Sequence, residues 1–235
     1  MDFFSGRVIE TRLSSSAQTI AVIACPQERI PAAGQYLQAH DPVDKEAALP
    51  LSIFPASPPL KSREGNAQFI TASPVPDTWQ PGNKLILRGP LGRGFELPDR
   101  AKRVALIAMA TNAERLLPLA FQAVEKGSEA ALFCDRAPLD APARVEINPL
   151  EDATDAFAWA DYAAIDVQKK DLAAVRAFLG LGQMPGIPAQ ALVQTQMPCG
   201  GLAGCGICWV KAAKGYKLAC SDGPVFDLAE IDLSG

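Results

Sequence analysis

The stretch MPCGGLAGCGICWVKAAKGYKLACSDGPVFD, residues 197–227, holds four of the six cysteines in this chain of 235 residues. Cys199, Cys205, Cys208 and Cys220 follow the spacing C-x5-C-x2-C-x11-C. Three thiols on one loop and a fourth from a later segment form a ligand pattern typical of iron–sulfur clusters. The glycines between them permit positive φ angles, which lets backbone N–H groups approach the sulfur atoms.

Two other interpretations of the four cysteines stay open at this point. A zinc site built from four cysteines usually has two C-x2-C pairs, whereas this stretch has one, Cys205 and Cys208. Disulfides or inert thiols fit poorly with the reducing compartment that the rest of the sequence suggests. The remaining two, Cys25 and Cys134, lie at the ends of apolar runs and are expected to be buried.

The composition predicts a packed globular protein, since 49% of the residues are hydrophobic and 20% are charged. A net charge of −4 argues against a nucleic-acid partner. The sequence has no apolar run long enough for a membrane span and no signal-peptide pattern, so a cytoplasmic location is expected. His40 is the single histidine, and no acid–base or nucleophilic pair stands out, so no catalytic residue is predicted.

The chain divides into three parts by its pattern. Residues 1–100 contain short strand-like runs separated by Pro and Gly, which predicts an antiparallel β-barrel. Residues 101–190 alternate buried strands with helices, which predicts a parallel α/β domain. Residues 191–235 are too poor in apolar side chains for a core of their own, so this small domain is expected to need a metal or another cross-link.

The segment CGGLAGCGICWVKAAKGYKLACSDGPVFDL, residues 199–228, resembles the C-terminal [2Fe–2S] domain of the electron-transfer subunit of class 1B dihydroorotate dehydrogenase. That family ends in a three-cysteine loop, a short hairpin, a fourth cysteine and the sequence DGPVF, found here at 222–226. The resemblance covers nearly the whole chain. It implies a multidomain fold with an FAD-binding barrel, a nucleotide-binding-like α/β domain and a cluster domain, with the four cysteines as metal ligands.

The resemblance also implies residues that contact FAD. The family has an Arg-Pro-Leu/Phe-Ser type stretch, which here reads LPLS at 49–52 and places Leu49 where the arginine would be. A further set of flavin-site residues is implied by the same stretch, by the end of AQFIT and by the turn in PGNKLILRGPLGRGFELP, namely Leu51, Ser52, Thr71, Gly89, Pro90, Leu91 and Gly92.

The nicotinamide site is expected to be degraded. A dinucleotide needs glycines after the first α/β strand, so that the backbone can approach the pyrophosphate at a helix N-terminus. The stretch AMATNAERLLP, residues 108–118, has no glycine and contributes Glu114 instead. We therefore expect weak or no NAD(H) binding.

The resemblance implies an electron-transfer subunit of an oxidoreductase rather than a stand-alone enzyme. It would pass electrons between a flavin-dependent dihydroorotate dehydrogenase catalytic subunit and an acceptor, through a [2Fe–2S] cluster and FAD, in pyrimidine biosynthesis. Its partner would be that catalytic subunit or another flavoprotein, in a hetero-oligomer with neither nucleic acid nor membrane. The alternative is a non-catalytic scaffold or regulatory subunit on a decayed reductase fold.

Overall fold

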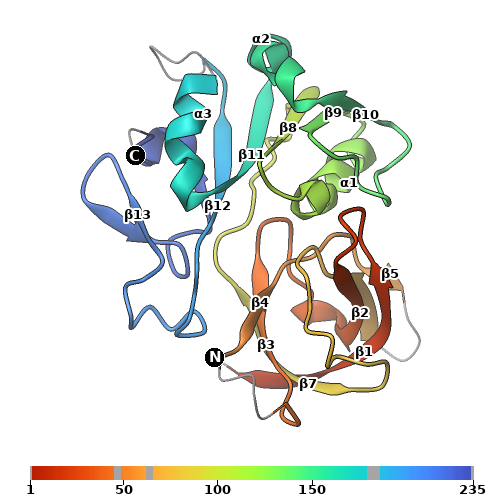
Figure 1. The fold of residues 1–235 in the computed structure, drawn as a ribbon. Helices are drawn as coiled ribbons and strands as arrows, with labels where there is room; N and C mark the ends of the chain where they lie inside the picture. Colours follow the sequence, from red (N-terminus) through yellow and green to blue (C-terminus); the bar gives the residue numbers. More distant parts are fainter. Residues whose placement is uncertain (1, 45–48, 62–65, 179–185, 234–235) are drawn as a thin grey trace.

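Antiparallel strands form the N-terminal barrel, in the spatial order β4-β3-β7-β1-β2-β6-β5 (Figure 1). The computed structural model describes residues 2–44, 49–61, 66–178 and 186–233. The barrel strands are β1 (Phe3–Leu13), β2 (Thr19–Pro26), β3 (Tyr36–His40), β4 (Leu51–Ile53), β5 (Leu60–Lys61), β6 (Asn66–Ile70) and β7 (Lys84–Leu91). An antiparallel bridge between Pro55 and Thr71 joins the segments that follow β4 and β6. The expected antiparallel barrel is confirmed.

A second sheet has the order β10-β9-β8-β11-β12-β15, and its first five strands are parallel. Its strands are β8 (Arg103–Met109), β9 (Glu129–Cys134), β10 (Val145–Pro149), β11 (Tyr162–Gln168), β12 (Ala189–Gln194) and β15 (Val225–Asp227). The middle of β8, from Val104 to Ala108, has no exposed surface, as expected for a parallel strand covered on both faces. The expected α/β domain is therefore confirmed as well.

Short helices connect the strands. They are η1 (Gln27–Arg29), η2 (Ala113–Leu116), α1 (Leu117–Glu125), η3 (Leu150–Asp155), α2 (Ala156–Trp159), η4 (Lys169–Asp171), α3 (Leu172–Phe178) and η5 (Leu228–Glu230). The helix expected after β8 begins as a 3₁₀ turn and continues as α1, which has a proline in its first turn. Gly127, at a φ of 77°, follows its end, as the sequence indicates.

The cysteine-rich segment leaves the α/β sheet after β12 and returns to it at β15. Between the two it forms the loop with the first three cysteines and a hairpin of β13 (Trp209–Lys211) and β14 (Tyr216–Leu218). The expected boundary at 190/191 thus falls inside β12, and β15 pairs antiparallel with β12. Figure 1 shows this segment beside both the barrel and the α/β sheet, which is how one loop contacts both.

Candidate metal centre

The four clustered cysteines meet in two pairs. The Cys205 thiol donates a hydrogen bond to the Cys199 sulfur, and the Cys220 thiol donates one to Cys208. Cys208 and Cys220 are buried, Cys199 is half-buried, and Cys205 is exposed at the surface. The loop thus places one pair at the surface and one pair beneath it.

Backbone N–H groups of the loop point at these sulfur atoms. Those of Leu202, Gly204 and Cys205 donate to Cys199, and that of Ala203 donates to Cys220. Ala203 adopts a φ of 58°, a left-handed conformation that alanine takes only when its surroundings hold it there. Such donors stabilise thiolate and sulfide, so the loop fits a negatively charged iron–sulfur group.

Cys199 and Cys220 differ in their ease of ionisation. Burial opposes ionisation of Cys199, but hydrogen bonds from the Cys205 thiol and from three backbone N–H groups outweigh it and lower the pKa to about 6. Burial raises the pKa of Cys220 to about 11, and the neighbouring Cys208 adds to the rise. A metal that binds Cys220 as a thiolate must therefore supply the positive charge that ionises it.

The pairing distinguishes between the metals considered from the sequence. Within the described residues, no three Cys, His, Asp or Glu side chains converge as ligands of one ion. Structural zinc requires four ligands around a single ion. A [2Fe–2S] cluster instead distributes four cysteines over two irons, two to each. The two pairs of thiols therefore fit the binuclear cluster better than zinc.

The barrel provides the support beneath the loop. Tyr36, which has no exposed surface, donates a hydrogen bond from its hydroxyl to the Cys220 carbonyl at 3.3 Å. A Cβ at Gly201 would lie 2.7 Å from the Tyr36 hydroxyl oxygen, so only glycine allows this close approach. Tyr36 and Arg88, which is 5% exposed, carry no signal in the sequence that marks them as neighbours of the cysteines.

An apolar hollow of about 640 Å³ opens between the loop and the outer face of the barrel. Strand register makes its floor, because Ser52 is opposite Gln38, Gln38 is opposite Arg88, and Arg88 is opposite Phe3. Cys199 stands in its wall. Phe3 and Leu202, each 70% exposed, stand at its sides. A group that enters the hollow therefore comes close to one of the four cysteines.

The stretch that suggested flavin contacts lies at one end of this hollow. Leu51 and Ser52 are half-buried, and the Ser52 hydroxyl accepts a hydrogen bond from Gln38 Nε2 at 2.7 Å. Gln38 is 3% exposed, and within the described residues its Oε1 has no hydrogen-bond partner. A buried acceptor without a donor fits a ligand that supplies one, as the ring N–H of a flavin does.

The other residues expected at the flavin site have packing roles in the structure. Thr71 is fully buried, and its hydroxyl accepts from the Ala21 N–H at 3.0 Å and donates to the Ser73 carbonyl at 3.2 Å. Leu49, at the position of the family's arginine, is 57% exposed. The contact of these residues with FAD stays a prediction.

The segment Gly89–Gly92, expected as a turn, is the end of strand β7 followed by Gly92, and it joins the barrel to the segment after Cys220. A Cβ at Gly92 would lie 2.6 Å from Pro224 Cδ and 2.7 Å from the Gly223 carbonyl oxygen. The next residue, Arg93, donates its backbone N–H to that same carbonyl and forms a bridge with Pro224. Residues 89–92 therefore position the DGPVF segment, and a direct contact with FAD remains a prediction.

A buried ion pair lies where the α/β sheet of related folds would receive a dinucleotide. Arg115 Nε and Asp166 Oδ2 are 2.8 Å apart, and their side chains are 8% and 0% exposed. Gln194 donates to the other carboxylate oxygen of Asp166 at 2.6 Å. Burial raises the pKa of Asp166, and the guanidinium of Arg115 partly offsets this rise. These side chains come from the carboxyl ends of β11 and β12 and from η2, so they occupy the switch-point edge of the sheet.

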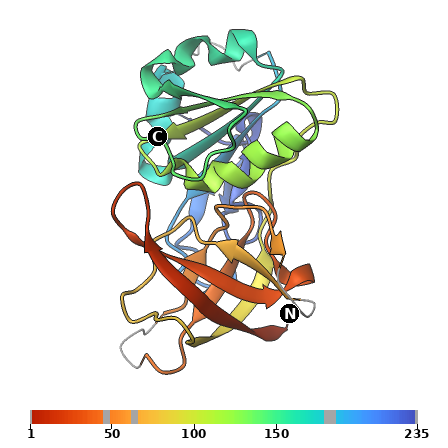
Figure 2. The same cartoon turned by 90° about the vertical axis from the view of Figure 1, so that its right-hand side faces the viewer.

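The turn between β1 and β2 reaches over the same edge (Figure 2). Ser15 donates to Glu114 at 2.8 Å, and Arg136 donates to the Ser15 carbonyl at 3.2 Å. Arg12 forms an ion pair with Asp140. These contacts fix the barrel against the segments that follow β8 and β9.

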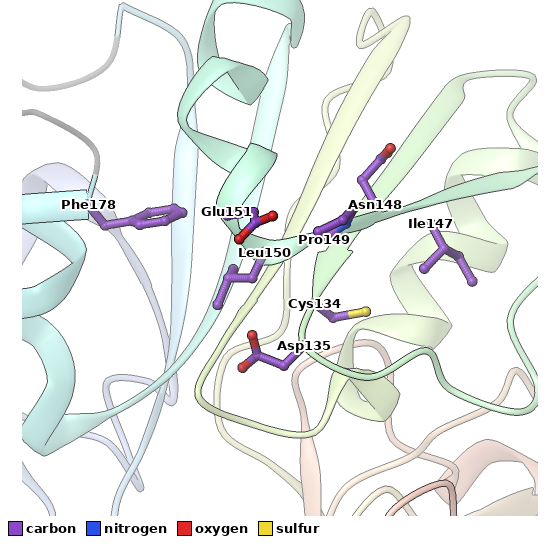
Figure 3. A pocket seen from close by; sticks show the side chains of 8 residues that line it. All are labelled: Cys134, Asp135, Ile147, Asn148, Pro149, Leu150, Glu151 and Phe178. Atoms are coloured by element: carbon purple, nitrogen blue, oxygen red, sulfur yellow. The ribbon is translucent and has the colours of Figure 1, made fainter.

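A second hollow, of about 590 Å³, adjoins the ends of β9 and β10 and includes Cys134 and Phe178 in its lining (Figure 3). Asp135 and Glu151 place carboxylates in its wall. Like charges repel, so these acids disfavour a phosphate-bearing ligand there.

The comparisons with known proteins agree with this geometry. Residues 194–232 match the family model described as the iron–sulfur cluster binding domain of dihydroorotate dehydrogenase B. The segment with the four cysteines is therefore similar to an iron–sulfur cluster binding domain. The resemblance drawn from the cysteine spacing and the DGPVF sequence is thereby confirmed. A search of curated proteins finds no match.

Solved structures share the fold of the whole chain. NADH-dependent reduced ferredoxin-NADP oxidoreductase, studied for flavin-based electron bifurcation, matches with a TM-score of 0.70 and 18% identity over 97% of this chain and 90% of that chain. Phthalate dioxygenase reductase matches with a TM-score of 0.56 and 15% identity over 83% and 70%. The ferredoxin reductase of carbazole 1,9a-dioxygenase matches with a TM-score of 0.58 and 15% identity over 80% and 67%. The chain therefore has the ferredoxin-reductase fold with an appended iron–sulfur domain. None of the helices described here is long and apolar enough to cross a membrane.

Proposed function

We propose that this chain is an electron-transfer subunit whose Cys199, Cys205, Cys208 and Cys220 hold a [2Fe–2S] cluster. The observation that carries the proposal is the arrangement of four thiols in two pairs beneath converging backbone N–H groups. When bound, such a cluster supplies a one-electron carrier. The backbone N–H groups of the loop favour the thiolate of Cys199, and the barrel supports the loop through Tyr36.

A second cofactor, FAD, is proposed for the barrel. Ser52 and Gln38 Oε1, which has no hydrogen-bond partner among the residues that the structure describes, support a flavin ring at this end of the hollow, because they offer a hydroxyl and an acceptor close together. The pyrophosphate has weaker support, since Leu49 stands at the position of the arginine, and Arg93 already pairs with Glu96 at 3.3 Å. Arg63, another candidate cation, lies outside the described residues.

The proposed partner is the catalytic subunit of a class 1B dihydroorotate dehydrogenase or another flavoprotein. The exposed Phe3 and Leu202 support a docking face at the hollow, because adjacent large apolar side chains in water favour protein contact. Docking there would place the partner against Cys199. Electrons would then pass between the partner's flavin and an acceptor by way of this chain.

The acceptor is proposed to be other than NAD. The Arg115–Asp166 pair, Glu114 and the β1–β2 turn occupy the edge where a pyrophosphate would need free backbone N–H groups. Calorimetric titration with NADH is expected to give no saturable heat up to millimolar concentration. Tight binding would remove this part of the proposal and leave the cluster unaffected.

The test of the whole proposal is anaerobic purification followed by iron, acid-labile sulfide and released-flavin assays on one sample. About two irons and two sulfides per chain, with stoichiometric FAD, are the expected result. Iron and sulfide without flavin would restrict the function to a cluster carrier. Zinc, or no metal, would overturn it and favour the scaffold alternative, which the intact cysteine set does not support.

A further inference from the structure

Lys169 lies against Trp209, the residue that follows Cys208, although it is distant from both in sequence. It is the first residue of η4, directly after β11, and its Nζ is 3.3 Å from the centroid of the Trp209 ring. Trp209 directly follows Cys208 and begins β13. The indole is held on another side by Tyr216, edge-to-face at 5.1 Å and 84°. The ammonium is therefore held by a cation–π contact next to a cluster ligand.

We infer that Lys169 raises the reduction potential of the cluster by holding a positive charge beside Cys208; this inference rests on the proposed function. Reduction adds a negative charge to a cluster of thiolates and sulfides, so a nearby cation stabilises the reduced form more than the oxidised form.

The ammonium and the Cys208 sulfur interact electrostatically. Cys208 is 1% exposed, whereas Lys169 is partly exposed to solvent. The interaction between the two groups is therefore expected to weaken as salt is added.

Other lysines of the same region are neutralised by carboxylates. Lys211 pairs with Asp232 at 2.9 Å, and Lys217 pairs with Glu230 at 2.6 Å. Among the residues that the structure describes, no carboxylate forms an ion pair with Lys169, and its contacts are the indole and the field of Cys208. The charge of Lys169 therefore acts on the cluster without a carboxylate to cancel it.

Trp209 has a supporting role in this arrangement. Its ring is 43% exposed, so it is a surface aromatic and not part of a core. It provides the surface on which the ammonium rests and thereby fixes the distance between that charge and Cys208. The contact also connects the cysteine hairpin to the end of β11 in the α/β sheet.

The test compares the cluster potential of the full chain with that of Lys169→Met, measured by anaerobic redox titration followed by absorption and electron paramagnetic resonance. Loss of the charge is expected to lower the potential. A tenfold fall in the ratio of reduced to oxidised cluster at fixed potential corresponds to about 59 mV for one electron. Lys169→Arg, which keeps the charge, is expected to retain most of the original potential.

The matched control is Lys170→Met, because Lys170 is exposed, lies in the same 3₁₀ turn and makes no contact with Trp209 among the interactions described. Its potential should equal that of the unmodified chain. Raising the salt concentration should reduce the difference between Lys169→Met and the unmodified chain, since the effect is electrostatic. An unchanged potential in Lys169→Met, or an equal shift in Lys170→Met, would overturn the inference.

Cluster content separates this outcome from failure of the proposed function. Iron and sulfide are measured on each variant before the titration. An unmodified chain without a cluster refutes the function itself, whereas a complete cluster whose potential ignores Lys169 refutes only the role of Lys169. If Lys169→Met assembles no cluster, Trp209→Leu is measured instead, because it removes the ring that holds the ammonium but keeps the charge. A lowered cluster potential in Trp209→Leu supports the inference, and an unchanged potential opposes it.

Discussion

At the scale of single residues, the cysteines of this chain have two different roles. Cys25 is 2% exposed within the barrel, and burial raises the pKa of its thiol to about 12, with Glu28 adding to the rise. It is a small apolar side chain that stays protonated. Cys199, in contrast, receives hydrogen bonds from three backbone N–H groups that favour its thiolate. Cys199 is therefore prepared to bind iron, whereas Cys25 is not.

The difference predicts separate outcomes for two serine substitutions. Cys208→Ser is expected to lose most of the bound iron and sulfide, because a hydroxyl is a poor substitute for a thiolate ligand. Cys25→Ser is expected to keep both and to lose only stability, since it buries a hydroxyl in an apolar core. Metal analysis of both purified variants checks this. Equal iron content in the two would contradict the assignment of Cys208.

Arg115 illustrates a residue whose role lies in the fold. Arg115→Met is expected to destabilise the chain by roughly 3–5 kcal/mol, because Asp166 keeps a buried carboxylate without its cation. Arg144→Met, at an exposed position, serves as the control and should stay within about 0.5 kcal/mol. Urea unfolding followed by circular dichroism measures both. A small effect at Arg115 would mean that the pair contributes little to closing the sheet edge.

At the scale of elements, the end of β7 and the following Gly92 link the barrel to the cysteine-rich segment. Gly92→Ala is expected to destabilise the fold by about 1–3 kcal/mol, since its Cβ would overlap Pro224 and the Gly223 carbonyl. Gly82→Ala is the matched control, because Gly82 also has a positive φ, 98° against 75°, but no atom lies within 4 Å of its Cβ position. Both substitutions introduce backbone strain. The additional loss of stability in Gly92→Ala therefore measures the steric overlap of the new Cβ with Pro224 and Gly223. Thermal unfolding and the iron retained by each variant provide the readout. Equal losses of stability in the two variants would contradict a role for the contact of Gly92 with Gly223 and Pro224.

The elements also show how far sequence reasoning extends. Apolar runs predict β8, β9 and β11, and the cysteine spacing predicts the ligand set, because both depend on local chemistry. The strand β10 was not predicted, since it is an edge strand whose side chains are mostly exposed. The Lys169–Trp209 contact and the hydrogen bond from Tyr36 to the Cys220 carbonyl join segments that are distant in sequence. No local sequence pattern encodes such pairings. The Gly-Pro-Leu-Gly stretch was recognised by resemblance, but only the coordinates reveal its contact with Pro224.

At the scale of the whole molecule, the exposed apolar side chains are unevenly distributed around the cysteine loop. Phe3, Ile86 and Leu202 all line the hollow that contains Cys199. The sheet edge on the α/β side is closed by the Arg115–Asp166 pair and by the β1–β2 turn. The open route to the cysteines therefore runs through the hollow and not across the edge of the α/β sheet.

This distribution predicts which surface a partner uses. Leu202→Asp is expected to weaken association with the same organism's dihydroorotate dehydrogenase catalytic subunit by at least about tenfold, or about 1.4 kcal/mol, because it places a charge in an apolar contact. Leu139→Asp is the matched control, since Leu139 is 73% exposed, close to the 70% of Leu202, but lies outside the hollow. Surface plasmon resonance with cluster-loaded protein measures both affinities. Unchanged iron and sulfide in Leu202→Asp would show that the loop still assembles, so a loss of affinity reports on docking. Equal affinities for the two variants would mean that the partner binds another face and that electrons reach the cysteines by a different route.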